Sequence, residues 1–275
     1  MPGRAGSNGK SRPLRLLQLT DTHFFGSAEG RLMGVDTALT FRQVLTLAHE
    51  KQGTPDFYLL TGDLSQDETQ NSYRRFAEAV RDMDAPAYYL PGNHDARPLM
   101  RSAFEAHGTP FHNETSFTYG NWHVILLDTQ VEGEVGGHLD RGELRRLDDA
   151  LSKHPEKHTL VTMHHHPLPV GSAWIDQIKI DNNDELLSIF DKHAQVRAVL
   201  CGHIHQEFEA RRGPVRYFGT PSTCVQFKPH SASFAVDVVP PGYRWMELHD
   251  DGTVKTGVVR VERVAPGLDL ASLGY

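Results

Sequence analysis

Five short apolar runs in the sequence each end in side chains that can bind a metal ion. Buried strands are commonly runs of this kind, four to eight residues long and bounded by turn residues. With the residues that end them, the runs are LRLLQLTDTH (14–23), FYLLTGDLSQD (57–67), AYYLPGNHD (87–95), HTLVTMHHHP (158–167) and VRAVLCGHIH (196–205). This repeated arrangement restricts the fold more than any other feature of the chain.

Stretches with a helical spacing of apolar residues lie between the runs. They cover residues 35–51, 67–83, 140–154 and 183–193. In the first of these stretches, Asp36 is a suitable N-cap residue for a helix. Because strands and helices alternate along the chain, the sequence predicts an α/β fold built of layers.

The residues after position 206 follow a different pattern, in which short β-like pieces are separated by Gly, Pro and Asp. A change from alternating elements to consecutive strands predicts a second, antiparallel sheet layer. Since no linker or low-complexity insert interrupts the chain, we expect residues 14–275 to form a single domain. Residues 1–13 are basic and polar, and we expect them to form a flexible N-terminal tail.

Composition and charge argue against several functional classes. The formal net charge of −7 disfavours nucleic acid or an anionic membrane as the main partner. No apolar run approaches the roughly 18 residues of a membrane-spanning helix, and the N-terminus lacks the apolar segment of a signal peptide. Cys201 and Cys224 are not in CxxC spacing, which suggests a reducing compartment. We therefore expect a cytoplasmic protein, and the sequence leaves its oligomeric state open.

The polar groups at the run ends are expected to meet in one crevice. In layered α/β folds, functional side chains gather just outside the carboxyl ends of the strands. The groups offered there are Asp21, His23, Asp63, Asn93, His94, Asp95, His164, His165, His166, His203 and His205. Each block alone could be a helix cap, a turn or a solvated loop. Because all of these alternatives would have to hold together, a shared site is the better interpretation.

The order of these blocks resembles that of the calcineurin-like metallophosphoesterases. The blocks are Asp-x-His (21–23), Gly-Asp (62–63), Gly-Asn-His-Asp (92–95), a histidine before His-Pro (166–167) and Gly-His-x-His (202–205). The resemblance implies a four-layer metallophosphoesterase fold, in which a two-sheet β-sandwich is flanked by helices. Outside the metal blocks, GTPSTCVQFKPH (219–230) is similar to the bacterial class III cyclic-AMP phosphodiesterases.

The resemblance also implies two metal ions per chain. Carried over block by block, it assigns Asp21, His23 and His205 to the first ion, Asn93, His165 and His203 to the second, and Asp63 to both. The family ligand usually stands two residues before the proline, which selects His165, and a shift of one residue would select His164. This mixture of ligands suits Fe, Mn, Co or Zn better than Ca or Mg alone, and we expect Fe, Mn or both.

The reaction that the resemblance implies is hydrolysis of 3′,5′-cyclic AMP to 5′-AMP, which would lower cyclic-AMP signalling. Two metal ions can activate water and clamp the attacking and leaving oxygens of a phosphodiester. The substrate is expected to contact His23, Asp63, Asn93, His94 and His205. His94 would stabilise the phosphoryl charge or protonate the leaving ribose oxygen, unless it is a structural turn residue, and Asp95 would fix its tautomer.

Other interpretations remain open at the level of sequence. Nucleotidases, phospholipid diesterases and protein phosphatases share the metal blocks, so the blocks alone do not choose the substrate. An inactive scaffold would be expected to have lost ligands, and a cyclic-nucleotide sensor would need an effector element that the sequence lacks. Residues 219–230 are expected to form a loop at the mouth of the crevice that favours the cyclic nucleotide. Within it, Phe227 would stack on the purine or pack in the core.

Overall fold

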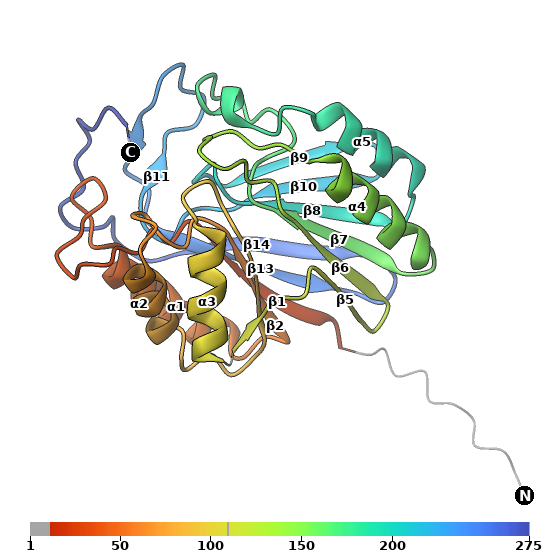
Figure 1. The fold of residues 1–275 in the computed structure, drawn as a ribbon, viewed down its shortest axis with the longest axis horizontal. Helices are drawn as coiled ribbons and strands as arrows, with labels where there is room; N and C mark the ends of the chain where they lie inside the picture. The colour runs from red at the N-terminus through yellow and green to blue at the C-terminus, as the bar shows by residue number, and fades with distance from the viewer. Residues whose placement is uncertain (1–11, 109, 275) are drawn as a thin grey trace, which may run out of the picture.

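Two six-stranded sheets lie face to face in the computed structural model, which describes residues 12–108 and 110–274 (Figure 1). The first sheet has the order β14 (Val254–Arg260), β13 (Gly242–Leu248), β1 (Leu14–Leu19), β2 (Phe57–Thr61), β3 (Ala87–Leu90) and β4 (Phe111–His112). The second has the order β5 (Ser116–Tyr119), β6 (Trp122–Leu127), β7 (His158–Met163), β8 (Val196–Cys201), β10 (Val215–Gly219) and β9 (Phe208–Arg212). A separate ribbon pairs β11 (Gln226–Phe227) with β12 (Val236–Asp237).

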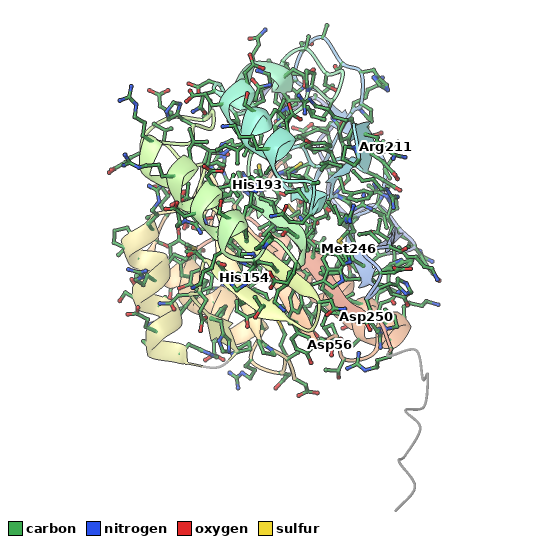
Figure 2. All side chains as sticks on the ribbon, turned by 90° about the vertical axis from the view of Figure 1, so that its right-hand side faces the viewer. Asp56, His154, His193, Arg211, Met246 and Asp250 are labelled. Carbon is green, nitrogen blue, oxygen red and sulfur yellow. The ribbon has the colours of Figure 1, made fainter. Side chains whose placement is uncertain are left out.

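Helices cover the outer faces of both sheets. The first sheet carries α1 (Thr37–Gln52), α2 (Gln70–Ala79) and α3 (Arg97–His107). The second carries α4 (Arg141–Lys153) and α5 (Asn183–Lys192), which follows a short 3-10 helix, η1 (Ile175–Ile178). Figure 2 shows α4 and α5 from outside, with His154 and His193 labelled at their C-terminal ends. The four layers confirm the predicted fold.

The central strands of both sheets are parallel and buried on both faces, which explains their continuous apolar character. Successive side chains point to opposite faces, so Leu16 packs between the sheets and Leu17 packs under the helices. Because parallel strands run the same way, their carboxyl ends lie at one edge of the sheet. The loops that carry the predicted site residues begin there.

The predicted helices agree with the structure to within a few residues. Asp36 caps α1 as expected, because its side chain accepts a hydrogen bond from the backbone N–H of Leu39 at 2.9 Å. The second helix begins later than predicted, because Thr69 is its N-cap residue. Helix α3 was not predicted, and its N-cap residue, Ala96, offers no side-chain hydrogen bond to the helix.

The prediction of a separate antiparallel layer after residue 206 is wrong. β9 and β10 extend the second sheet, where β10 pairs in parallel with β8. β13 and β14 extend the first sheet, where β13 pairs antiparallel with β1. The C-terminal strands therefore complete the two sheets, next to β8 and β1.

The core between the sheets draws on both halves of the chain, and Leu16 of β1 shares it with Leu126 of β6 and Met246 of β13. A single domain over residues 14–275 stays a prediction. The predicted tail, residues 1–13, lies almost entirely outside the described residues. Among the described residues, no helix combines the length and the apolar character needed to cross a bilayer.

Candidate metal centre

The loops that follow five strands bring the predicted ligands together. The loops that carry them follow β1 (Asp21 and His23), β2 (Asp63), β3 (Asn93), β7 (His165, or His164 if the register shifts by one) and β8 (His203 and His205). Asn93 is half-buried, and the other six side chains are fully buried. Burying carboxylates and imidazoles is costly unless each has a partner of suitable charge or hydrogen-bonding capacity.

Five of these residues adopt a backbone conformation that L-amino acids rarely take. Asp21, His23, Asp63, His203 and His205 have φ angles between 47° and 67°. Residues other than glycine are uncommon in this left-handed region, and such strain concentrates at functional sites. Five residues predicted as ligands from the sequence alone are therefore also sites of backbone strain.

Asp21, His23 and His205 form the first cluster. The Nε2 atoms of His23 and His205 are 3.2 Å apart, and Nε2 of His205 is 3.4 Å from Oδ1 of Asp21. Ligand atoms that lie about 2.1 Å from one ion, at right angles around it, are about 3 Å apart. The spacing of the three side chains therefore fits a single cation between them.

Asn93, His164 and His203 form the second cluster. Nε2 of His164 is 3.1 Å from Oδ1 of Asn93, and the rings of His164 and His203 meet edge to face at 5.1 Å. Among the described residues, neither ring nitrogen of His203 has a hydrogen-bond partner, although the side chain is fully buried. Buried polar atoms without partners are rare and need an explanation. The predicted role as a metal ligand would satisfy this imidazole.

Asp63 lies between the two clusters. Its Oδ2 atom is 3.3 Å from Nε2 of His164 and 3.8 Å from Nε2 of His23. Apart from these two imidazoles, the buried Oδ2 atom has no hydrogen-bond partner among the described residues. Oδ1 accepts a hydrogen bond from the backbone N–H of His94 at 2.8 Å. One carboxylate oxygen that faces both clusters fits the predicted bridging role.

The structure favours His164 over His165 as the ligand from the histidine run. Both ring nitrogens of His165 have other partners, since Nδ1 is 2.8 Å from Oγ1 of Thr129 and Nε2 is 3.3 Å from the carbonyl oxygen of Val135. His164 is the first residue after β7, and the chain turns it into the crevice. His164, His165 and His203 all bring ligand atoms within 4.8 Å of one another, so His165 lies at the same centre. We propose His164 for this position, the one-residue shift that the sequence left open.

Backbone carbonyl groups orient two of the imidazoles. Nδ1 of His164 lies 2.8 Å from the carbonyl oxygen of Thr61, and Nδ1 of His205 lies 2.7 Å from that of Val225. A carbonyl oxygen accepts only, so each Nδ1 atom must carry the proton. In the neutral form of each ring, the Nε2 atom then presents its lone pair to its cluster, which is the form that binds a metal; His164 would give up its Nε2 proton on binding an ion.

The pKa values in the site describe a pocket that favours a cation. Burial lowers the pKa of His23 to about 3 and that of His203 well below its ordinary value, so both rings are neutral. Burial also opposes a charge on His164, but Asp63 outweighs it and raises the pKa of His164 to about 9. Burial would raise the pKa of Asp63, yet His164 and His94 hold it well below its usual range. Positive charge is thus stabilised beside Asp63.

Glycines allow the loops to approach one another closely. Gly62 has a φ angle of 91°, and a Cβ atom there would lie 2.5 Å from Nδ1 of His164. A Cβ atom at Gly92 would collide with the carboxylate of Asp63. A larger residue at either position would push the bridging carboxylate or its neighbouring imidazole out of place.

Asp95 has partners that differ from those expected. Its carboxylate accepts hydrogen bonds from the backbone N–H groups of Leu64, Ser65 and Gly92 and from the hydroxyl of Tyr73. Burial and the nearby charge of Asp63 raise its pKa to about 7. These contacts join the loop after β2 to the loop after β3. We therefore assign Asp95 to positioning these loops, in place of fixing the tautomer of His94.

Residues 219–230 support the first cluster from behind. The hydroxyl of Ser222 donates a hydrogen bond to the carbonyl oxygen of Asp21 at 2.7 Å. The ring of Phe227 is buried and stacks on the ring of His205, with centroids 4.1 Å apart and planes 8° from parallel. Of the two roles considered for Phe227, packing is therefore the one the structure has. Sequence reasoning missed the contacts of Val225 and Thr61 with the ligands, because backbone carbonyls carry no side-chain signal.

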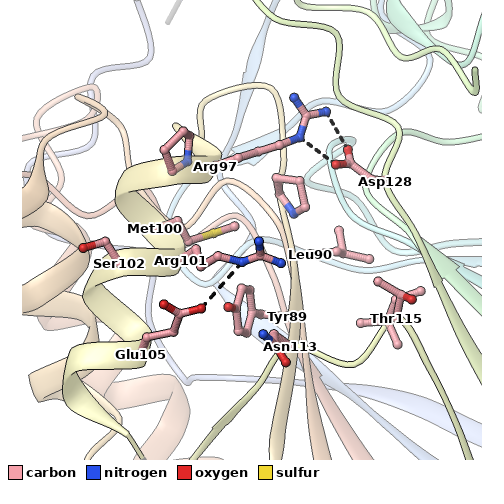
Figure 3. Close-up of a pocket in the computed structure, with 13 residues that line it drawn as sticks. Tyr89, Leu90, Arg97, Met100, Arg101, Ser102, Glu105, Asn113, Thr115 and Asp128 are labelled. Carbon is pink, nitrogen blue, oxygen red and sulfur yellow. Dashed lines mark hydrogen bonds and ion pairs between the residues drawn. The ribbon is translucent and has the colours of Figure 1, made fainter.

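Two cavities lie next to each other beside α3. The larger, of about 770 Å³, is lined by Asn93, His94 and Asp95 and so opens onto the second cluster. The smaller, of about 520 Å³, shares Arg97 and Pro98 with it but is lined by none of the predicted ligands. Figure 3 shows the smaller cavity, with Arg97 paired to Asp128 and Arg101 paired to Glu105. The larger cavity is therefore the one that a substrate of this centre would enter.

The fold and the clusters agree with what comparison with known proteins shows. The family model described as calcineurin-like phosphoesterase matches residues 14–207. The chain belongs to the calcineurin-like phosphoesterase family. A dimetal phosphatase from Danio rerio has a similar structure, with a TM-score of 0.64 at 15% sequence identity, covering 91% of this chain and 99% of that chain. At that identity the likeness shows the fold alone.

Within the family, the chain is similar to curated bacterial enzymes over nearly its whole length. It is 42% identical to the 3′,5′-cyclic adenosine monophosphate phosphodiesterase CpdA of Escherichia coli (strain K12), covering 97% of this chain and 96% of that protein. It is also 42% identical to the protein of that name from Pseudomonas aeruginosa, covering 94% of both chains. A 3′,5′-cyclic-nucleotide phosphodiesterase from Nostoc is 39% identical, covering 96% of this chain and 98% of that protein.

Proposed function

We propose that this protein hydrolyses 3′,5′-cyclic AMP to 5′-AMP at a dinuclear metal centre. One observation carries the metal part of the proposal: the buried Oδ2 atom of Asp63 faces an imidazole from each of two ligand clusters. The choice of substrate is supported by the names of the curated relatives at 42% identity over nearly the full length. Hydrolysis of this second messenger would lower cyclic-AMP signalling.

The donor atoms of both clusters fit transition-metal ions. We propose that Asp21, His23 and His205 hold one ion, that Asn93, His164 and His203 hold the other, and that Asp63 joins them. Imidazole nitrogens with few carboxylates suit Fe and Mn, and also Co or Zn, better than Ca or Mg. When bound, the ions would neutralise phosphate charge and lower the pKa of water.

The side chains around the metal ions would orient the substrate, supply a proton and position the loops. Asn93 and His94 line the cavity beside the second cluster, where they would orient the phosphoryl oxygens. As water adds to phosphorus and the bond to the ribose 3′ oxygen breaks, His94 would supply a proton to that oxygen. His23, Asp63 and His205 would complete the surface that the phosphoryl group meets. Asp95 and Ser222 would hold the loops that place these groups.

The proposed setting is the cytoplasm, where cyclic AMP would be the small-molecule partner. Cys201 and Cys224 are free and buried, which suits a reducing compartment. The formal charge of −7 disfavours nucleic acid or an anionic membrane as a partner.

A substrate panel tests this proposal. The purified protein is stripped of metal with a chelator, reconstituted separately with Mn²⁺, Fe²⁺, Co²⁺ or Zn²⁺, and given cyclic AMP, cyclic GMP, linear dinucleotides and bis(p-nitrophenyl) phosphate. We expect 5′-AMP from cyclic AMP, no activity in the stripped protein, and recovery with Mn²⁺ or Fe²⁺. Full activity after stripping would refute the metal centre. Turnover of bis(p-nitrophenyl) phosphate without turnover of cyclic AMP would leave a metallophosphoesterase of another specificity.

A further inference from the structure

The larger cavity beside the second cluster has more room than a phosphate needs. Its volume of about 770 Å³ lies within the range of roughly 300–1,000 Å³ in which small-molecule sites usually fall. Asn93 and His94 occupy only the part next to the metal residues. Most of the remaining lining comes from Asp95, Ala96 and the start of α3 and from the loop between β6 and α4, with Glu68 from the loop between β2 and α2.

Two exposed apolar side chains line this remaining part. Among the described residues, seven large apolar side chains are exposed, and two of them, Leu99 at 38% and Val135 at 56%, line this one cavity. They come from different elements, since Leu99 lies in the first turn of α3 and Val135 lies in the loop before α4. Apolar surface left exposed inside a cavity commonly marks a ligand site.

Both apolar residues lie close, along the chain or in space, to residues of the predicted metal centre. Leu99 follows His94 by five residues, and the backbone N–H of Ala96 between them donates a hydrogen bond to the Tyr73 hydroxyl at 2.7 Å. The carbonyl oxygen of Val135 lies 3.3 Å from Nε2 of His165. These contacts link the two apolar walls to the elements that carry His94 and His165.

The charges around the cavity indicate what kind of ligand it takes. Glu68, Glu132 and Glu134 line it, and the one cationic side chain of its lining, Arg97, is already paired with Asp128 at 2.6 Å. Carboxylates repel a second phosphate group, whereas they accept hydrogen bonds from sugar hydroxyl and ring amino groups. The cavity thus suits the neutral part of a ligand whose only anionic group is bound at the metals.

We propose that Leu99 and Val135 form the walls of a nucleoside subsite, in which a purine ring packs between them while its single phosphate reaches the metal centre. This inference rests on the proposed function, because it takes the phosphate to be bound beside Asn93 and His94. It adds to that function the residues that bind the base.

Equilibrium binding to the metal-loaded protein tests the subsite. The ligands are 5′-AMP and ribose 5-phosphate, which differ by the base, and affinities are measured by calorimetry. We expect the wild type to bind 5′-AMP more tightly, and Leu99→Ala and Val135→Ala each to weaken 5′-AMP by about 3- to 10-fold through lost apolar contact. Affinity for ribose 5-phosphate should not change. The matched control is Val238→Ala, since Val238 is 58% exposed and lies outside this cavity.

The possible outcomes separate this inference from the proposed function. A wild type that binds both ligands equally, or variants that weaken both ligands alike, would overturn the subsite. Unchanged 5′-AMP affinity in both variants would overturn it as well. If the variants selectively weaken 5′-AMP but the wild type does not hydrolyse cyclic AMP, the subsite holds and the proposed reaction fails. If the wild type hydrolyses cyclic AMP but both variants bind 5′-AMP as tightly as the wild type, only the subsite is refuted.

Discussion

Adjacent histidines in one short run have different surroundings, and those surroundings predict different effects of substitution. We expect His164→Ala to lower both metal affinity and catalytic activity by more than about 10²-fold, because the Nε2 atom of His164 faces Asp63 and Asn93. His165→Ala should retain close to the wild-type metal content, since Thr129 and Val135 already engage its ring. Metal analysis of both purified variants checks this. The reverse order of metal loss would restore His165 as the ligand.

His94 should act on the substrate and leave metal binding intact. Its backbone N–H supports Asp63 at 2.8 Å, and alanine keeps that hydrogen bond. We therefore expect His94→Ala to lower kcat by about 10²–10⁴-fold, the usual contribution of a general acid or base, with unchanged metal content. Steady-state kinetics and metal analysis of the same preparation test both parts. A variant that loses an ion would place His94 among the ligands.

At the scale of single residues, the sequence predicted which side chains meet in the site but not which partners orient each of them. The order of the blocks was sufficient to place Asp21, His23 and Asp63 in one site. Within the run of three histidines it selected His165, whereas the contacts favour His164, because counting back from Pro167 does not reveal where β7 ends. It also could not find that Asp95 binds backbone N–H groups, since those partners have no side-chain signature.

At the scale of elements, residues 219–230 are the segment whose interpretation changed most. The sequence suggested a loop that selects the cyclic nucleotide. In the structure, Ser222 holds the carbonyl of Asp21, and Phe227 packs on His205. The segment therefore supports metal ligands, and the proposed base walls come from α3 and the loop before α4.

Removing the Ser222 hydroxyl should weaken metal binding and leave substrate preference unchanged. Partners that orient ligands typically contribute 10- to 100-fold to metal affinity. We expect Ser222→Ala to lower metal affinity by about 10-fold, measured by competition with a chromogenic chelator. The rates for cyclic AMP and bis(p-nitrophenyl) phosphate should fall together at limiting metal and recover together at high metal. Exposed Ser233→Ala is the control, and a selective loss of cyclic-AMP turnover would return the segment to substrate recognition.

Helices were easier to predict than strand order, for a physical reason. A helix is set mainly by local spacing, with a cap to mark its start, as Asp36 shows for α1. α3 was missed, and its N-cap residue, Ala96, offers no side-chain cap. Strand pairing depends on contacts far apart in sequence, such as Leu14 opposite Leu248. Alternating apolar residues mark a strand but do not say which sheet it joins.

On the scale of the whole molecule, loops from both sheets meet at one buried polar edge of the sandwich. The parallel strands place the seven predicted ligands there, and the core between the sheets joins β1 and β2 to β7 and β8. Neither half of the chain holds a complete centre, because the first cluster joins Asp21 to His205 and Asp63 joins both clusters. The site therefore requires both halves of the sandwich to be in place.

Stability of the whole molecule should depend on pH through His123, which lies on β6 away from the metal centre. Its ring is buried, lies 2.6 Å from the Ser116 hydroxyl and meets the His154 ring at 4.9 Å. Burial, followed by the nearby His154 and Lys157, lowers the pKa of His123 to about 4, although Glu156 opposes them. Below about pH 6.5 the unfolded chain binds a proton here that the folded protein binds only near pH 4.

The contribution of His123 to stability is thus complete above pH 6.5 and is lost as the pH falls toward 4. His123→Gln keeps a hydrogen-bonding side chain near Ser116 but does not titrate. We expect the free energy of unfolding of the wild type, relative to that of the variant, to fall by about 1–2 kcal/mol between pH 6.5 and 4, after allowing for solvent screening. Urea unfolding of both metal-free proteins at several pH values measures this difference, in which the other titrating groups cancel. A difference that stays constant over that range would mean that His123 takes up its proton equally in the folded and unfolded chains.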